Sequence, residues 1–168
     1  MKIGPSQTID DGLQFKLSLF YFMLFLSIGC YLPYFSLWLK ARGLDGDESS
    51  IILAAPMIIR IFFTPIVSIW ADFEGDYRKI LIILTGGSLI AIVGLGFVDG
   101  FWPILIVASL NAIFGSSIIP LTETMAMIGV RVSQLRYGRA RSFGSFSFIV
   151  GSLLAGVLVD YAGSEIVL

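Results

Sequence analysis

Five long apolar blocks, separated by short polar segments, dominate this sequence. They cover about residues 17–39, 51–71, 80–98, 101–127 and 142–159. A helix needs roughly 20 mostly apolar residues to cross the hydrocarbon core of a bilayer, and each block is about that long. The segments between the blocks are too short to form a folded domain. The pattern therefore predicts an all-α integral membrane protein with about five transmembrane helices.

The composition supports this class and argues against several others. Of the 168 residues, 57% are hydrophobic and 14% are charged, which is typical of a membrane protein and not of a soluble domain. The net charge of −1 and the lack of a basic tract with interleaved aromatic residues argue against a nucleic-acid partner. With no histidine and only one cysteine, Cys30, we expect no metal site, no cofactor and no internal disulfide.

The basic residues predict the orientation of the chain in the membrane. Residues 1–16 have no apolar core, so we expect no secretory signal peptide and a retained first helix. A cytoplasmic N-terminus puts eight basic residues inside and two outside, in line with the positive-inside rule. The inside set is Lys2, Lys16, Arg78, Lys79, Arg131, Arg136, Arg139 and Arg141, and the outside set is Lys40 and Arg42.

Small residues and prolines inside the apolar blocks predict how the helices pack and bend. Small side chains recur at every fourth position, which lets helix backbones approach closely in lipid. These positions are Ser147/Gly151/Ala155, Ser152/Gly156 and Ala108/Ala112/Ser116. Each proline removes a backbone hydrogen bond and favours a kink. The prolines inside the blocks are Pro33, Pro56, Pro65 and Pro120.

One short motif occurs twice. The second block ends with a small residue, Asp72 and Gly75, and the fifth ends with the same spacing at Gly156, Asp160 and Gly163. The topology above puts these two exits on opposite sides of the membrane, as an inverted repeat of three helices plus three predicts. Such a repeat would require a sixth helix that begins near Ile166.

Two charged residues stand out within apolar surroundings. Glu123 lies in the fourth block, and Arg141 lies at the start of the fifth. An ionised side chain at membrane depth costs about 2.5–3.5 kcal/mol on insertion scales, so it usually has both a partner and a function. A carboxylate and a guanidinium can neutralise each other and still hydrogen-bond a polar ligand. We therefore expect either a substrate contact or a structural ion pair between these two helices.

Four stretches resemble the major facilitator superfamily, and more narrowly the proton symporters grouped around lactose permease and the phenylpropionate transporter. They are GCYLPYFSLWLK at residues 29–40, DFEGDYRK at 72–79, PLTE at 120–123 and YGRARSFG at 137–144. The spacing from Glu123 to Arg141 also matches that of lactose permease. The stretch at 72–79 departs from the superfamily pattern, because Phe73 replaces a basic residue and one extra residue precedes Arg78.

The resemblance implies the fold and the activity. Members of the superfamily have twelve helices in two six-helix halves, so residues 17–168 would form an incomplete N-terminal bundle whose C-terminal half is missing. The expected activity is transport of a small polar or anionic organic solute, a sugar or an aromatic acid, across the inner membrane by alternating access, coupled to protons. The expected partners are the solute, protons and the lipid bilayer.

The resemblance also assigns candidate residues. Glu123 and Arg141 would bind substrate, and Arg60 would pair with an anionic substrate or, structurally, with Glu123. Asp72, Gly75, Arg78 and Lys79 would form a cytoplasmic gating motif, with Asp160 as its counterpart in the repeat.

Four further polar or aromatic side chains are candidates to line the cavity. Tyr31, Tyr34 and Trp38 are spaced to share one helix face, where they would stack on substrate or pack on neighbouring helices. Asn111 would face the cavity or form a bond between helices. From this set, we count Tyr31, Tyr34 and Asn111 among the substrate-binding residues.

Other functions remain open from the sequence. A five-span membrane subunit without transport activity is the main alternative. A membrane-embedded enzyme is a weaker one, because a chain without histidine has few residues for a nucleophile–base pair.

Overall fold

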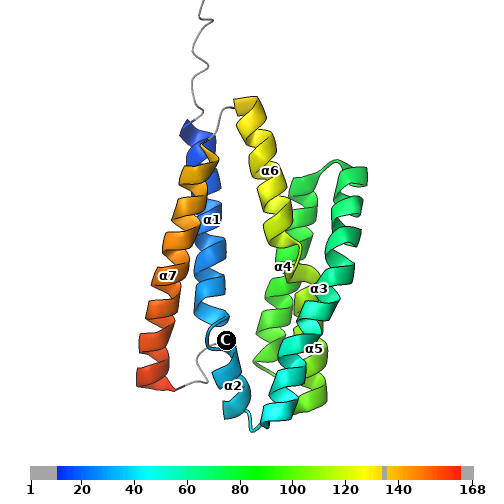
Figure 1. Ribbon diagram of the computed structural model, residues 1–168, viewed down its shortest axis with the longest axis vertical. Helices are drawn as coiled ribbons and strands as arrows, with labels where there is room; N and C mark the ends of the chain where they lie inside the picture. Colours follow the sequence, from blue (N-terminus) through cyan, green and yellow to red (C-terminus); the bar gives the residue numbers. More distant parts are fainter. Residues whose placement is uncertain (1–10, 134–135, 164–168) are drawn as a thin grey trace, which may run out of the picture.

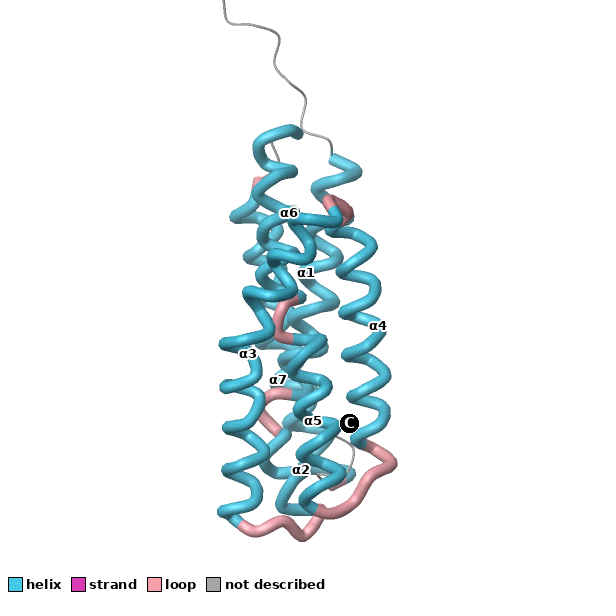
Figure 2. Tube along the Cα trace, turned by 90° about the vertical axis from the view of Figure 1, so that its right-hand side faces the viewer, coloured by secondary structure: helices cyan, strands magenta, loops and turns pink. Residues whose placement is uncertain are grey.

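The computed structural model describes residues 11–133 and 136–163, and within these ranges every regular element is a helix. The helices are α1 (Asp11–Tyr31), α2 (Phe35–Ala41), α3 (Gly46–Glu74), α4 (Tyr77–Leu95), α5 (Phe101–Gly115), α6 (Ile118–Ser133) and α7 (Tyr137–Ala162). They lie side by side along one long axis (Figures 1 and 2). Residues 1–10 and the expected start of a sixth helix near Ile166 lie outside the described residues.

The described helices form five membrane-spanning units, as the apolar blocks predict. The units are Gly12–Ala41, Gly46–Glu74, Tyr77–Leu95, Phe101–Arg131 and Tyr137–Tyr161. Four of them extend beyond their apolar blocks by four or five residues at one end, because polar residues cap or continue the helix. Asp45 and Glu48, for example, form a reciprocal capping box that starts α3 before the second block begins.

Two of the expected proline kinks interrupt a span. Residues 32–34 form a turn around Pro33 that separates α1 from α2. The fourth span breaks between α5 and α6 at Ser116 and Ser117, just before Pro120. Proline has no N–H to donate to the carbonyl four residues earlier, which here belongs to Ser116. By contrast, α3 continues without interruption through Pro56 and Pro65.

Two helix pairs organise the bundle. In one pair α1 packs along α7, and in the other α3 packs along α5, with α4 packed against α5 (Figure 1). In an inverted repeat, the first span (α1 and α2) corresponds to the fourth (α5 and α6), and the second span (α3) corresponds to the fifth (α7). The contact between the first and fifth spans therefore corresponds to the contact between the fourth and second spans. The C-terminal ends of α3 and α7 lie at opposite ends of the bundle (Figure 1), and Gly75 and Gly163 follow them with φ of 71° and 87°. The arrangement fits the inverted repeat that the sequence motif predicts.

The α1–α7 contact depends on glycine. A Cβ atom at Gly29 would lie 2.5 Å from the carbonyl oxygen of Phe148, and one at Gly151 would lie 2.7 Å from that of Leu26. The hydroxyl of Ser152 donates to the Gly29 carbonyl across the contact at 3.2 Å. The small residues of the fifth block therefore let two backbones touch, which confirms the predicted packing role.

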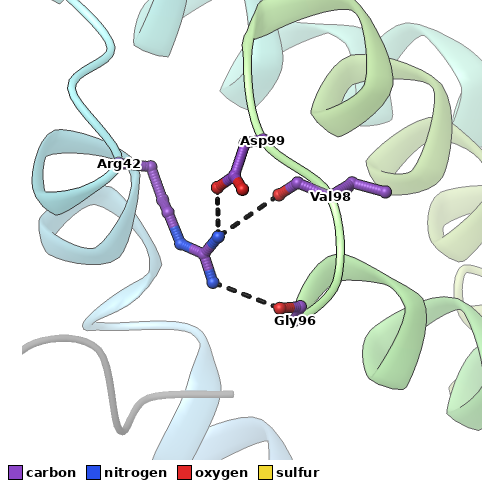
Figure 3. A network of polar contacts seen from close by, with 4 residues as sticks. All are labelled: Arg42, Gly96, Val98 and Asp99. Atoms are coloured by element: carbon purple, nitrogen blue, oxygen red, sulfur yellow. Dashed lines mark hydrogen bonds and ion pairs between the residues drawn. The ribbon is translucent and has the colours of Figure 1, made fainter.

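The end of the bundle that contains α2 has an aromatic core and a set of contacts around Arg42, which we call the Arg42 clamp. Trp38 and Leu39 of α2 are fully buried among residues of α3, α4 and α5. Arg42, which follows α2, stacks its guanidinium on the Trp38 ring at 4.9 Å. It also donates to the carbonyls of Gly96 and Val98 and forms an ion pair with Asp99 (Figure 3). One side chain thus ties the end of the first span to the connection between α4 and α5.

Replacing Gly29 by alanine is expected to destabilise the bundle. The new methyl group meets a backbone carbonyl that cannot move aside, and overpacking of this kind costs about 1–3 kcal/mol. Gly86 is the matched control, because a Cβ there meets nothing within 4 Å and alanine favours a helix by up to ~1 kcal/mol over glycine. Thermal unfolding in detergent micelles measures both variants. Equal melting temperatures for the two would contradict the expected close approach.

Replacing Arg42 by glutamine is expected to cost about 1 kcal/mol, because the clamp is partly exposed and each of its bonds is weak in water. Lys40→Gln serves as the control, since the Lys40 side chain is exposed and forms no ion pair or side-chain hydrogen bond with the described residues. Denaturant titration in micelles gives the free energy of unfolding for each variant. If Arg42→Gln unfolds like Lys40→Gln, the clamp does not hold the two segments together.

Candidate functional site

The candidate site centres on an ion pair between α6 and α7. The Nε atom of Arg141 lies 3.5 Å from a carboxylate oxygen of Glu123, and the two side chains are 36% and 38% exposed. Both positions are fixed by their neighbours, since Leu121, Thr122 and Ala140 are buried. The two residues that the sequence selects as a pair therefore do meet.

An aromatic wall from α1 supports Arg141. The guanidinium lies over the ring of Phe25 at 4.4 Å, and Phe25 stacks on Tyr21 with centroids 6.2 Å apart. The Tyr21 ring in turn meets Tyr137 of α7 edge-on at 6.5 Å. A cation over an aromatic face gains electrostatic attraction in a desolvated site. The wall fixes one face of the guanidinium and leaves its outer nitrogens available.

Sequence reasoning missed Phe25 and Tyr21. Their spacing of four residues puts them on the same face of α1, but other apolar residues of the helix share such spacings. Tyr21 is fully buried, and its hydroxyl interacts with that of Tyr137 on α7. The Tyr21 hydroxyl lies near enough to Glu123 and Arg141 to interact electrostatically with both charges. The signal available in the sequence was the hydroxyl of Tyr21, a polar group within an apolar span that needs a partner.

The pair has unused hydrogen-bonding capacity. A contact of 3.5 Å is long for a charged hydrogen bond, which usually measures 2.7–2.9 Å. A carboxylate has a second oxygen, and a guanidinium has five donors. The geometry can therefore accept a polar ligand that bridges or replaces the contact between Glu123 and Arg141.

Arg60 lies apart from this pair. It is exposed on α3, and it forms no hydrogen bond or ion pair with any residue the structure describes. The alternative of a structural pairing with Glu123 therefore finds no contact here. A bare guanidinium is too costly to face hydrocarbon, so its side of α3 must meet water or another polar surface.

The three aromatic residues of the first span occupy different environments. The turn at residues 32–34 interrupts the helix, so Tyr31, Tyr34 and Trp38 do not form the continuous face that their spacing predicts. Trp38 belongs to the core, and the Tyr34 hydroxyl donates to the Ser152 carbonyl at 2.8 Å. Tyr31 lines a cavity of about 360 Å³ between α1, α4, α5 and α6.

Asn111 lines the same cavity and also joins two helices. Its side-chain oxygen accepts a hydrogen bond from the Ser88 hydroxyl at 2.7 Å. This is the contact between helices that the sequence offered as one of two alternatives. The Asn111 amide also interacts with the Tyr31 hydroxyl, so the two polar residues of this cavity lie together.

The candidate gating motif forms local contacts at the end of α3. Asp72 accepts a hydrogen bond from the Tyr77 hydroxyl at 2.6 Å, and Lys79 pairs with Glu74 at 2.5 Å. Arg78 is exposed, and the carboxylate of Asp160 at the end of α7 is exposed and forms no ion pair with the described residues. A tyrosine, and not a neighbouring cation, is thus the partner of Asp72 in this conformation.

No three histidine, cysteine, aspartate or glutamate side chains within residues 11–133 and 136–163 come close enough to hold a metal ion. The contacts that join the described spans are instead apolar, aromatic, ionic or hydrogen-bonded.

Comparisons with known proteins agree with the membrane-spanning helical fold. Residues 14–168 match the model of the MFS_1 like family. The chain is 30% identical over 159 residues to a probable 3-phenylpropionic acid transporter of Escherichia coli (strain K12), covering 90% of this chain and 40% of that protein. It is 26% identical to a maltose permease of Geobacillus stearothermophilus, covering 89% of this chain and 38% of the relative.

A lactose permease of Citrobacter freundii is also 26% identical, over 78% of this chain and 33% of its own length. No solved structure shows a significant match. The chain spans about two fifths or less of these relatives, which are transporters and not enzymes. With five spans, a charged pair between the fourth and fifth, and a family match over nearly its whole length, this chain is a multi-pass membrane protein that belongs to the MFS_1 like family of the major facilitator superfamily.

Proposed function

We propose that this chain forms the N-terminal bundle of a secondary transporter that moves a small organic anion through the inner membrane by alternating access. The partly exposed ion pair of Glu123 and Arg141 carries the proposal. An ion pair that serves only to hold helices together offsets its desolvation cost when its geometry is good and its remaining hydrogen-bonding groups are satisfied. This pair is long and open on one side, as a site that exchanges ligands requires.

The balance of charges favours an anionic substrate. Two arginines, Arg141 and Arg60, and one carboxylate, Glu123, give these three positions a net positive charge. A substrate carboxylate would pair with a guanidinium in a bidentate manner. One relative is named as a probable transporter of 3-phenylpropionic acid, a compound of this kind with an aromatic ring and a carboxylate. Phe25, which Tyr21 supports from behind, offers aromatic surface next to Arg141 for such a ring.

The proposed mechanism moves the bundle as a unit. The glycine contacts between α1 and α7 and the Arg42 clamp tie four of the five spans together. A second bundle, outside this chain, would supply the other wall of the site and would cover Arg60. Residues 17–168 would belong to the first bundle, with the N-terminus in the cytoplasm.

The remaining residues have supporting roles in this proposal. Asn111 and Tyr31 would offer polar contacts from the neighbouring cavity. Asp72 would exchange Tyr77 for a partner on the second bundle when the cytoplasmic side closes, and Gly75, Arg78 and Lys79 would shape that loop. Proton coupling is proposed from the similarity to the lactose-permease group.

Uptake measurements on the complete gene product test the substrate site. Glu123→Gln, Arg141→Lys and Arg60→Gln are each expected to lower uptake of 3-phenylpropionate by about 10–100-fold, because a lost charged hydrogen bond costs about 1.5–3 kcal/mol. Arg141→Lys keeps the charge and loses the planar fork, so it tests geometry. Arg131→Gln is the control, as an exposed cation away from the pair.

Binding of radiolabelled 3-phenylpropionate and of lactose to the purified protein separates the substrate classes. The anion should bind and lactose should not. Lactose binding with no effect of Arg60→Gln would overturn the assignment to anions. Normal uptake in both Glu123→Gln and Arg141→Lys would overturn the site itself.

A further inference from the structure

A second feature of the α1–α7 pair is not used by the proposed transport site. Beside the first turns of both helices lies a cavity of about 460 Å³. Four of the residues that line it are phenylalanines, namely Phe15, Phe22, Phe143 and Phe146. Phe15, Phe143 and Phe146 are at least half exposed, so the walls of this groove present open aromatic surface.

The groove is polar only where it meets the loop between α6 and α7. The polar lining residues are Gln14, Ser18 and Arg139, and none of the described residues that line the groove is acidic. Gln14 is occupied, because its amide group bonds both the N–H and the carbonyl of Arg136, and Ser18 donates to the Gln14 carbonyl at 2.9 Å. The guanidinium of Arg139 is exposed and has no ion pair or hydrogen bond with any described residue.

The position of Arg139 separates this groove from the candidate transport site. Successive residues of an α-helix are turned by about 100°, so Arg139 and Arg141 lie on nearly opposite faces of α7. Arg141 meets Glu123 and Phe25 on the inner face, and Arg139 opens onto the groove. Arg139 also belongs to the first turn of α7, where the helix dipole favours a negative charge.

We infer that this groove binds an anionic phospholipid, with the phosphate on Arg139 and an acyl chain along the four phenylalanines. The groove is apolar along most of its length and has one unpaired cation at its end. This division matches that of a lipid into an acyl tail and a charged head group. Basic pockets between transmembrane helices bind anionic head groups for this reason. The inference depends on the membrane-spanning fold and not on the substrate of the transporter.

Tryptophan quenching by brominated lipids tests the inference in the complete gene product. Phe143→Trp places a reporter in the groove, and its signal is taken as the difference from the wild-type protein. In nanodiscs, phosphatidylglycerol with brominated acyl chains should quench this reporter more strongly than brominated phosphatidylcholine at the same fraction. Adding Arg139→Gln should weaken the preference for phosphatidylglycerol over phosphatidylcholine about fivefold, because it removes one contact between a basic side chain and the lipid phosphate.

Three controls make the result specific. Ile149→Trp, exposed on α7 and outside the groove, should be quenched equally by both lipids. Arg136→Gln should leave the preference intact, whereas a loss as large as that of Arg139→Gln would indicate general attraction to a basic loop and overturn the site. If Phe143→Trp does not fold, Phe146→Trp reports on the same groove.

Two other outcomes would also overturn the inference. Equal quenching of the groove reporter by both lipids means ordinary solvation by the bilayer. No quenching by either lipid means that protein covers the groove, either a further segment of the polypeptide or a second copy. Uptake of 3-phenylpropionate by the same variants is read separately, so failure of the lipid site and failure of the transport site are distinguishable.

Discussion

The structure depends on the direct backbone contact between α1 and α7. In lipid, two helices gain little from burying apolar side chains, because the surrounding acyl chains are equally apolar. Close van der Waals contact and hydrogen bonds between helices must hold the pair instead, and both require small residues. Gly29 and Gly151 provide the contact, and the hydroxyl of Ser152 adds a hydrogen bond across it. This contact brings Phe25 beneath Arg141, so it positions the charged pair as well as the helices.

Two arginines that pair with carboxylates in this bundle are stabilised in different ways. Near the end of the bundle, Arg42 combines an aromatic stack, two carbonyls and a carboxylate. Within the bundle, Arg141 has one aromatic ring and one long contact to Glu123. The first arrangement saturates most donors of its guanidinium, and the second leaves several unused. A saturated arginine suits a fixed joint, whereas an unsaturated one suits a ligand site.

Hydropathy predicted the existence of the five spans, because it measures the transfer of whole segments into hydrocarbon. The pairing of Glu123 with Arg141 could also be predicted, since two opposite charges on consecutive spans need each other. The breaks at residues 32–34 and at Ser116 and Ser117 were harder to locate. A proline removes a bond to a carbonyl one turn earlier, and whether the helix breaks there depends on local packing. Pro56 and Pro65 carry the same local signal without a break.

The rotation of each helix about its own axis could not be predicted from the sequence. The stretch YGRAR at residues 137–141 contains two arginines with similar neighbours, and hydropathy treats them alike. The structure separates them because Ala140, between the two, is fully buried against Tyr21 and Ala126. Once a small residue fixes that face, the helical turn of about 100° per residue sends one arginine to each side. Arg141 then meets Glu123 and Arg139 opens onto the groove, so the packing of one methyl group determines which cation belongs to the candidate site.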